Sequence, residues 1–286
     1  MEQGHIDLHV HTTASDGTLS PAGLVTFARE KGLRAVAVTD HDTVEGLSEA
    51  LAEAAKRNFE VVPGVEISVD YHGGEMHILG YYVDPGSKPL LDSLEQLQEY
   101  RLERNPKVIR KLRELGMHIS LEEVTEAAGG NVIGRPHFAA VLVRKGYVAD
   151  TREAFDKYLG SGQPAYVKKE KLTPAEGIEL ILKAGGVPVL AHPKYIKDHN
   201  PDRLSALLEK LKGAGLKGVE VYYTTHTPEE TALYLRLAQQ HSLLVTGGTD
   251  FHGANKPEIE LGTGTGGNLK IPYELLTELK KVVERT

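Results

Sequence analysis

Two histidines separated by one residue, His9 and His11, are the first side chains of this sequence that suggest chemistry. Side chains on a β-strand alternate between its two faces, so His-x-His on a strand places both imidazoles on one face. Two imidazoles on one face can chelate one metal ion. Core packing or chance explains most isolated pairs of this kind, so the interpretation depends on the motifs that follow.

Histidine and acidic residues recur in further short motifs, and imidazole and carboxylate ligands suit divalent Mn, Fe or Zn. The first motif runs from Asp7 to Gly17 and contains both histidines and Asp16. In the second motif, Asp40 and Asp42 flank His41, and their carboxylates could orient imidazoles by hydrogen bonding to ring nitrogens that do not bind metal. The later motifs, in chain order, are Thr39-Asp40-His41-Asp42, Pro63-Gly64-Val65-Glu66, His77-Ile78-Leu79-Gly80, Leu190-Ala191-His192-Pro193 and Gly248-Thr249-Asp250-Phe251-His252.

The composition limits the kind of protein and the kind of site. The chain has 286 residues, with 13 His and no Cys, which excludes a disulfide scaffold and a thiolate metal site. The lack of Cys suits a reducing compartment, and we see no signal peptide and no apolar run of about 20 residues. We therefore expect a cytoplasmic protein with no membrane segment and no stable protein partner. A net charge of −7 disfavours general nucleic-acid binding, although bound cations could reverse the sign at a site.

The motifs need structural elements that bring them together. Short apolar runs, typical of strands buried on both faces, alternate with helical stretches. Helix starts are indicated where a capping residue precedes proline, at Ser20, Thr173, Asn200 and Thr227. This alternation predicts a parallel α/β barrel, whose active-site face is formed by the carboxyl ends of the strands. Nearly all the motifs close or follow a predicted strand; these strands are residues 6–10, 34–39, 60–65, 76–83, 187–191, 218–222 and 243–246.

The alternation of strands and helices fails between residues 85 and 167. A long charged helical stretch is predicted at residues 92–115, with a bend near Pro106. Shorter helical pieces follow at residues 121–128, 136–144 and 151–159. We expect a barrel of residues 1–84 and 168–286, with a mostly helical insertion domain of residues 85–167 that covers the substrate site.

Taken in order, the motifs resemble those of the PHP (polymerase and histidinol phosphatase) family from residue 5 to about residue 252. The resemblance implies a distorted seven-stranded (βα) barrel that holds up to three divalent metal ions, with Mn²⁺ expected and Fe²⁺ or Zn²⁺ as alternatives. Matched motif by motif, it implies three ligand sets, the first two bridged by Glu66: His9, His11, Glu66 and Asp250; Glu66, His77 and His192; and Asp16, His41 and His252.

The predicted insertion carries the motif Ile133-Gly134-Arg135-Pro136-His137. A guanidinium fork matches phosphate oxygens, and His137 begins a predicted helix whose N-terminus favours anions. The insertion and motif resemble a bacterial PHP branch that hydrolyses nucleoside 3′,5′-bisphosphates and includes the exonuclease RNase AM. That resemblance implies that Arg135 and His137 contact substrate phosphate. Without it, a surface Arg and a helix-start His would be the simpler interpretation.

Three further side chains are weaker candidates for substrate contact. Tyr222 and His226 follow a predicted strand and could stack on or position a base, but a loop packed over the barrel explains them equally well. Lys168, in a basic stretch directly after the predicted insertion, could reach a phosphate, although charged runs usually face solvent.

The hypothesis that joins these observations is a metal-dependent phosphatase that removes the 3′-phosphate of a nucleoside 3′,5′-bisphosphate and could also trim short 5′-phosphorylated oligonucleotides. A hydroxide bridging two ions would attack phosphorus in line, while Arg135 and His137 neutralise charge on the phosphate oxygens. The alternatives are a histidinol-phosphate or broad-specificity phosphatase, an amidohydrolase, and a non-catalytic, metal-stabilised PHP module. The complete ligand set argues against the last of these.

Overall fold

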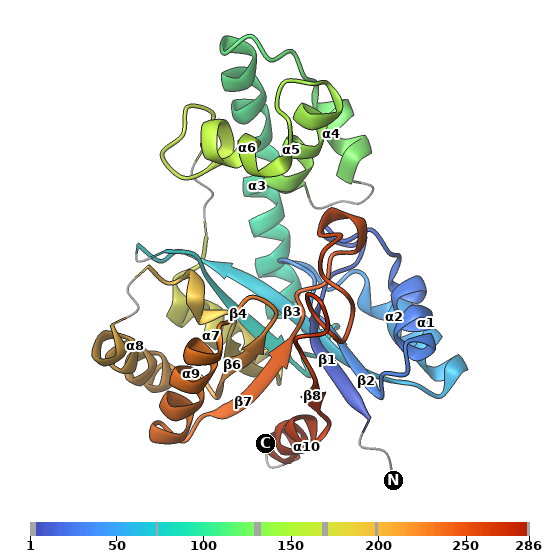
Figure 1. The fold of residues 1–286 in the computed structure, drawn as a ribbon, viewed down its shortest axis with the longest axis vertical. Helices are drawn as coiled ribbons and strands as arrows, with labels where there is room; N and C mark the ends of the chain where they lie inside the picture. The colour runs from blue at the N-terminus through green and yellow to red at the C-terminus, as the bar shows by residue number, and fades with distance from the viewer. Residues whose placement is uncertain (1–3, 73, 129–132, 168–170, 198–199, 285–286) are drawn as a thin grey trace.

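The computed structural model describes residues 4–72, 74–128, 133–167, 171–197 and 200–284. Its centre is an eight-stranded sheet with the strand order β7-β6-β5-β4-β3-β2-β1-β8. Figure 1 shows the sheet in the lower half of the molecule, with helices around its outer side. The strands are β1 His5–Val10, β2 Ala35–Val38, β3 Glu60–Val69, β4 Met76–Tyr81, β5 Val187–Leu190, β6 Gly218–Tyr223, β7 Leu244–Gly248 and β8 Ile271–Pro272.

The α/β barrel is confirmed, but the number and direction of its strands differ from the prediction. The eighth strand, β8, has two residues and pairs antiparallel with β1. So short a strand has no periodic signature in a sequence. β4 pairs antiparallel with both β3 and β5. Only residues 70–75 separate β3 from β4, and a connection of that length permits a hairpin but not a parallel crossover.

The barrel is nearly closed where the segment after β7 meets β1. The backbone N–H of Asp250 donates to the carbonyl of His9 (2.9 Å). Asp7, fully buried in β1, accepts hydrogen bonds from the backbone N–H (2.9 Å) and the hydroxyl (2.6 Å) of Thr249. Burial raises the pKa of Asp7 to about 6, although these hydrogen bonds oppose the rise. The closure places the first and last histidine motifs of the sequence side by side.

Helices cover the outer side of the barrel, and four of them begin where the sequence predicts. Each of the four predicted capping side chains accepts a backbone N–H from the first turn of its helix. Within the described residues, no helix combines the length and apolar character that crossing a bilayer requires. The barrel helices are α1 Pro21–Glu30, α2 Leu47–Arg57, α7 Pro174–Lys183, α8 Pro201–Gly213, α9 Pro228–Gln240 and α10 Glu274–Val283.

Between β4 and β5 the chain forms a group of helices with a hydrophobic core of its own. Phe138 and Leu142 are fully buried in that core together with Leu112 of the long helix α3. The helix α3 is continuous through Pro106. Figure 1 shows the shorter helices at the far end of α3, above the barrel. The helices are α3 Lys88–Glu114, α4 Leu121–Ala128, α5 Arg135–Arg144, α6 Thr151–Ala154 and the π-helix Phe155–Leu159.

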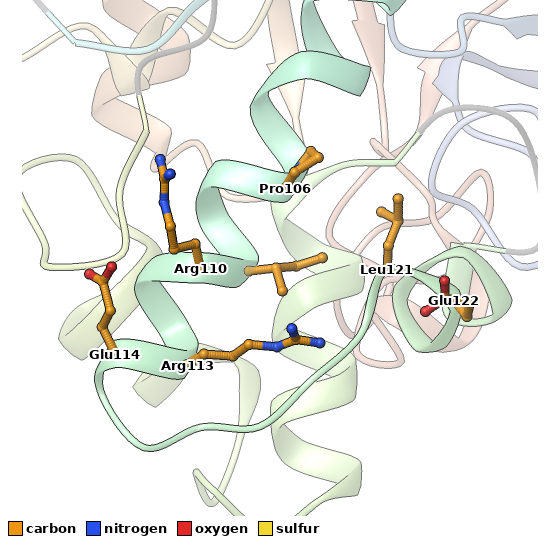
Figure 2. Close-up of a pocket in the computed structure, with 7 residues that line it drawn as sticks. Pro106, Arg110, Arg113, Glu114, Leu121 and Glu122 are labelled. Atoms are coloured by element: carbon orange, nitrogen blue, oxygen red, sulfur yellow. The ribbon is translucent and has the colours of Figure 1, made fainter.

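A hollow of about 670 Å³ lies between α3 and α4 (Figure 2). Its lining includes Pro106 and Arg113 of α3 and Leu121 of α4. The Arg113 Nε–H donates to the carbonyl of Ile119 (2.9 Å), which fixes the guanidinium to the connection between the two helices. None of the predicted site residues that the structure describes lines this hollow.

Gly248, at the end of β7, is a position where two strands approach closely. A Cβ there would lie 2.2 Å from the Cβ and 2.5 Å from the backbone N of His9. We expect Gly248→Ala to displace β1 and to lower the free energy of unfolding by about 1–3 kcal/mol, measured by thermal or urea unfolding. Gly213→Ala in α8 is the control, because its Cβ would meet nothing within 4 Å. Equal stability of the two variants would contradict the close approach.

Candidate metal centre

The nine side chains predicted to bind metal lie together in the structure. They come from β1, β3 and β4 and from the segments that follow β1, β2, β5 and β7, so most lie on the face formed by carboxyl ends of strands. Glu66 was expected to follow its strand but lies inside β3, because that strand continues to Val69 as one arm of the hairpin with β4. All except His41 are buried; the nine are His9, His11, Asp16, His41, Glu66, His77, His192, Asp250 and His252.

The fully buried carboxylate of Glu66 lies at the centre of this cluster. Its Oε2 is 3.3 Å from Nε2 of both His9 and His11. The same oxygen is 2.9 Å from Nδ1 of His41. In the described part of the chain none of these four atoms has a hydrogen-bond partner, although the distances are short. Buried polar atoms are rarely left in that state, so atoms that converge without bonding to one another fit a shared cation.

The other oxygen of Glu66 faces a second pair of imidazoles. Its Oε1 is 2.8 Å from Nδ1 of His77 and 2.9 Å from Nε2 of His192. Glu66 thus joins two groups of imidazoles, one at each carboxylate oxygen. This is the arrangement that a carboxylate bridging two ions needs.

Asp16 and Asp250 complete the cluster on the side away from His77. The carboxylate of Asp16 is 3.3 Å from Nε2 of His252 and 3.9 Å from Nε2 of His41. Asp250 Oδ1 is 3.1 Å from Nε2 of His11. Potential ligand atoms of Asp16, His41 and His252 lie within 4.8 Å of one another, together with one from His11. The division of the nine residues into sets for individual ions stays a prediction.

Three residues at or beside the cluster have left-handed backbone conformations. His192 has φ 23°, Asp250 has φ 58° and Asp42 has φ 51°. Residues with side chains rarely adopt positive φ, and such strain tends to occur at functional sites. The backbone therefore holds two of the predicted ligands in conformations that relaxed loops would avoid.

The carboxylates control the protonation of the imidazoles around them. Burial lowers the pKa of His11, but Asp250 and Glu66 outweigh it and raise that pKa to about 9. At His77 burial prevails over the attraction of Glu66, and the pKa falls to about 4. Burial also opposes ionisation of Glu66, yet neighbouring imidazoles, His41 foremost, hold its pKa well below the usual range. The carboxylates of Asp16, Glu66 and Asp250 therefore stay ionised, since the pKa of each lies well below its usual range, and ionised carboxylates favour cations.

Glu220 is a residue of this site that sequence reasoning missed. Fully buried in β6, it lies with Oε1 3.0 Å from Nδ1 of His9, and its Oε2 accepts the backbone N–H of His192 (2.8 Å). A carboxylate can only accept hydrogen bonds, so the neutral ring of His9 keeps its hydrogen on Nδ1 and its lone pair on Nε2, toward the cluster. The signal available in the sequence was a single acidic residue between Val219 and Val221 in an otherwise apolar strand.

The variant Glu220→Gln tests this orienting role. A carboxamide can present its NH₂ group to Nδ1 of His9 and so favour the wrong tautomer. We expect metal affinity and catalytic efficiency to fall by about 10–100-fold, measured by metal titration and steady-state kinetics. Glu230→Gln, in the exposed capping box of α9, serves as the control and should leave both quantities unchanged. Wild-type metal affinity in Glu220→Gln would contradict the role.

Asp40 and Asp42 hold the loops around the cluster. Asp40 accepts hydrogen bonds from the hydroxyls of Thr12 (2.7 Å) and Ser15 (2.6 Å), and the Ser15 hydroxyl lies 3.5 Å from Nδ1 of His11. Asp42 accepts bonds from the backbone and hydroxyl of Ser68. Asp40 thus reaches an imidazole through Ser15, and a direct orienting role of either aspartate stays a prediction.

A cavity of about 860 Å³ lies between the cluster and the segment that connects β4 to β5. Asp16, His41 and His77 line it from the barrel, and Arg135 and Tyr166 line it from that connecting segment. The guanidinium carbon of Arg135 is 5.8 Å from the centre of the Tyr166 ring. A molecule in the cavity would therefore meet the cluster on one wall and the guanidinium on the other.

Arg135 already faces an acidic side chain across this cavity. Its Nη2 is 3.9 Å from the carboxylate of Glu75, and its Nη1 donates to the carbonyl of Leu159 (3.4 Å). Burial opposes ionisation of Glu75, but the charges of His77 and Arg135 outweigh it and lower the pKa to about 2. An anionic ligand that binds Arg135 must compete with this ionised carboxylate.

His137 lies in the first turn of α5, close to the predicted helix start, but its ring turns back on the helix. The Nδ1 atom accepts the backbone N–H of Gly134 (3.0 Å), and the ring is buried and outside the cavity lining. A histidine at this position caps the helix because the first N–H groups of a helix lack partners within it. Contact of His137 with substrate phosphate stays a prediction.

The three weaker candidates for substrate contact lie apart from the cavity or outside the described residues. Tyr222 packs against the hydrophobic cores of the barrel, and Nδ1 of His226 is 2.9 Å from the carbonyl of Val221. These contacts favour the packing role that the sequence left open for both. Lys168 lies outside the described residues. Tyr223 contacts the cluster instead, since its hydroxyl donates to Oδ2 of Asp250 (2.8 Å).

Comparison with known families decides how this cluster is classified. A family model described as the PHP domain matches residues 7–249, which include seven of the nine clustered residues; the other two, Asp250 and His252, belong to the last motif and lie just beyond the match. The chain belongs to the PHP family. Its sequence motifs and its barrel therefore have a common explanation.

Relatives of this PHP-family chain cover almost its whole length. It is 34% identical over 260 residues to the 3′,5′-nucleoside bisphosphate phosphatase of Chromobacterium violaceum, covering 90% of each chain. It is 35% identical over 265 residues to the 5′-3′ exoribonuclease Rnm of Escherichia coli, covering 90% of this chain and 87% of the relative.

Two solved structures share the whole fold of this PHP-family chain. One, from Chromobacterium violaceum, is described as an amidohydrolase with bound sulfate and no metal; it is 31% identical, with a TM-score of 0.86 and coverage of 97% of this chain and 96% of that one. The other, from Bifidobacterium adolescentis, carries the provisional description of metal-dependent phosphoesterase; it is 31% identical, with a TM-score of 0.84 and coverage of 98% and 96%.

Proposed function

We propose that this chain is a metal-dependent phosphoesterase that removes the 3′-phosphate of nucleoside 3′,5′-bisphosphates. The observation that carries the proposal is the position of Arg135 across the cavity from the nine-residue cluster. Such a cavity suits a ligand with two phosphates, one at the cluster and one at the guanidinium fork. The Chromobacterium violaceum relative, which is named for this activity, supports the choice of substrate.

The nine clustered side chains fit divalent cations, because buried imidazole nitrogens and a carboxylate oxygen converge there without hydrogen-bond partners among the described residues. We propose that the three predicted ligand sets hold up to three ions, with Mn²⁺ first and Fe²⁺ or Zn²⁺ as alternatives. Nitrogen and oxygen donors without thiolates suit these metals. Bound ions would supply acidification of water and neutralisation of charge on phosphate oxygens.

The protein's own part in the reaction is to bind and orient the substrate. Arg135 would pair with phosphate oxygens in place of Glu75, and His137 would assist if its ring turned toward the cavity. We further propose that residues 85–167 form an insertion domain that covers the substrate on the barrel of residues 1–84 and 168–286. The cytoplasm is the proposed location, since the site contains no residue that requires oxidising conditions.

A second activity, 5′-3′ exonuclease action on short oligonucleotides, is favoured by the relatives named for it in Escherichia coli and Salmonella typhimurium. Both activities would cleave the ester at the 3′-oxygen of a nucleotide that carries a 5′-phosphate. One site could therefore serve both, with the larger substrate extending out of the cavity.

The test compares catalytic efficiency on adenosine 3′,5′-bisphosphate, AMP, histidinol phosphate and a short 5′-phosphorylated RNA, each with added Mn²⁺. We expect the bisphosphate to be the best monoester substrate. Equal rates on AMP and histidinol phosphate would favour the broad-specificity alternative. Turnover of amides but not phosphate esters would favour an amidohydrolase, and metal binding without turnover would favour the non-catalytic module.

A further inference from the structure

Lys256 places a permanent positive charge against the nine-residue cluster. It follows the 3-10 turn Gly253–Asn255 after β7, and its Nζ is 2.6 Å from Oδ2 of Asp250. The hydroxyl of Tyr223 donates to the same oxygen (2.8 Å). Two donors, an ammonium and a hydroxyl, therefore hold Oδ2 of Asp250.

The other oxygen of Asp250 is directed into the cluster. Oδ1 is 3.1 Å from Nε2 of His11 and 3.6 Å from Nε2 of His9. Because Oδ2 is already engaged by an ammonium and a hydroxyl, Asp250 can offer only Oδ1 to an ion that the two histidines hold. The lysine thereby fixes both the direction of the carboxylate and the number of oxygens it presents.

The charge of Lys256 acts in opposite directions on the metal-free and the metal-loaded protein. Without metal, Asp16, Glu66 and Asp250 repel one another, and a nearby ammonium offsets part of that repulsion. With metal, the same ammonium repels the divalent ion on the other side of Asp250. The short distance between Nζ of Lys256 and Oδ2 of Asp250 is that of an ion pair, so we treat the side chain as an ammonium.

We infer that Lys256 is a resident cation of the metal centre: it stabilises the metal-free protein and weakens the binding of the ion held through Asp250. The inference rests on the proposed metal centre but not on the identity of the substrate.

The experiment is Mn²⁺ titration by calorimetry, together with thermal unfolding in chelator, on the wild type and three variants. Lys256→Met removes the charge and keeps the length of the side chain. Lys256→Arg keeps the charge. Tyr223→Phe is the matched control, because it removes the other donor to the same oxygen without changing charge.

We expect Lys256→Met to bind one Mn²⁺ about tenfold more tightly. Its metal-free form should melt about 3 °C lower than the wild type. Lys256→Arg should match the wild type in both measurements, and Tyr223→Phe should show no gain in affinity. Unchanged or weaker Mn²⁺ binding in a folded Lys256→Met protein would overturn the inference, as would an equal gain in Lys256→Arg.

The two proposals fail in different ways. If the wild type binds no Mn²⁺, the proposed metal-dependent function and this inference both fall. If the wild type binds Mn²⁺ and Lys256→Met binds it no better, only the role of Lys256 is wrong. If the variants bind Mn²⁺ as inferred but the protein turns over no phosphate ester, the role of Lys256 is supported and the proposed phosphatase activity is wrong.

Discussion

Glu66→Gln should abolish activity, lowering catalytic efficiency by roughly a thousandfold or more, and should strip bound metal from the protein. Glu66 contacts imidazoles through both oxygens, from His9 on one to His192 on the other. A carboxamide has the same shape but no charge, and only one of its two polar atoms can accept. Metal content by elemental analysis and steady-state kinetics measure the two effects.

Glu260→Gln is the control for Glu66, because it makes the same change at an exposed surface ion pair with Lys31. It should keep wild-type metal content and activity. Thermal unfolding separates loss of metal from loss of fold: Glu66→Gln should still unfold cooperatively but should gain little stability from added Mn²⁺. A Glu66→Gln protein that retains its metal and its activity would show that the cluster is not organised around this carboxylate.

Arg135→Ala should reduce catalytic efficiency on a nucleoside 3′,5′-bisphosphate by about 10–100-fold, because charge-assisted hydrogen bonds to phosphate contribute roughly 1.5–3 kcal/mol. The loss should be much smaller on AMP, which has only one phosphate. Arg135→Lys should restore part of the activity, since a point charge replaces a planar fork. Kinetics on the two substrates measure the difference.

The control for Arg135 is Arg110→Ala, which removes an exposed arginine of α3 in the same insertion, beside the hollow drawn in Figure 2. It should leave both substrates unaffected. Equal losses on bisphosphate and monophosphate in Arg135→Ala would mean that the guanidinium contacts the phosphate at the cluster. No loss on either would remove Arg135 from the substrate site.

Local patterns in the sequence predicted the barrel, and the resemblance of the motifs to the PHP family implied the nine clustered residues. The spacing of His9 and His11 reflects the period of two in a strand, and the other motifs follow strands whose ends meet on one face. Glu66 was predicted as a site residue although the end of its strand was predicted wrongly. Its position beside the other motifs depends on the fold of the barrel and not on the residue at which β3 ends.

The residues that support the cluster could not be predicted in the same way. Glu220 lies 211 residues after His9 in the sequence, and only the register of β6 against its neighbours brings the two side chains together. Lys256 lies in a loop with no periodic pattern, and its contact with Asp250 depends on a 3-10 turn. For His137 the sequence motif suggests contact with phosphate, but in the structure its ring caps its own helix by accepting the backbone N–H of Gly134.

The most direct test of the proposed activity follows adenosine 3′,5′-bisphosphate by ³¹P NMR during incubation with the Mn²⁺-loaded protein. The proposal predicts that the 3′-phosphate resonance disappears while inorganic phosphate accumulates and the 5′-phosphate resonance remains, so that the product is AMP. An unchanged spectrum, or loss of the 5′-phosphate first, would contradict it.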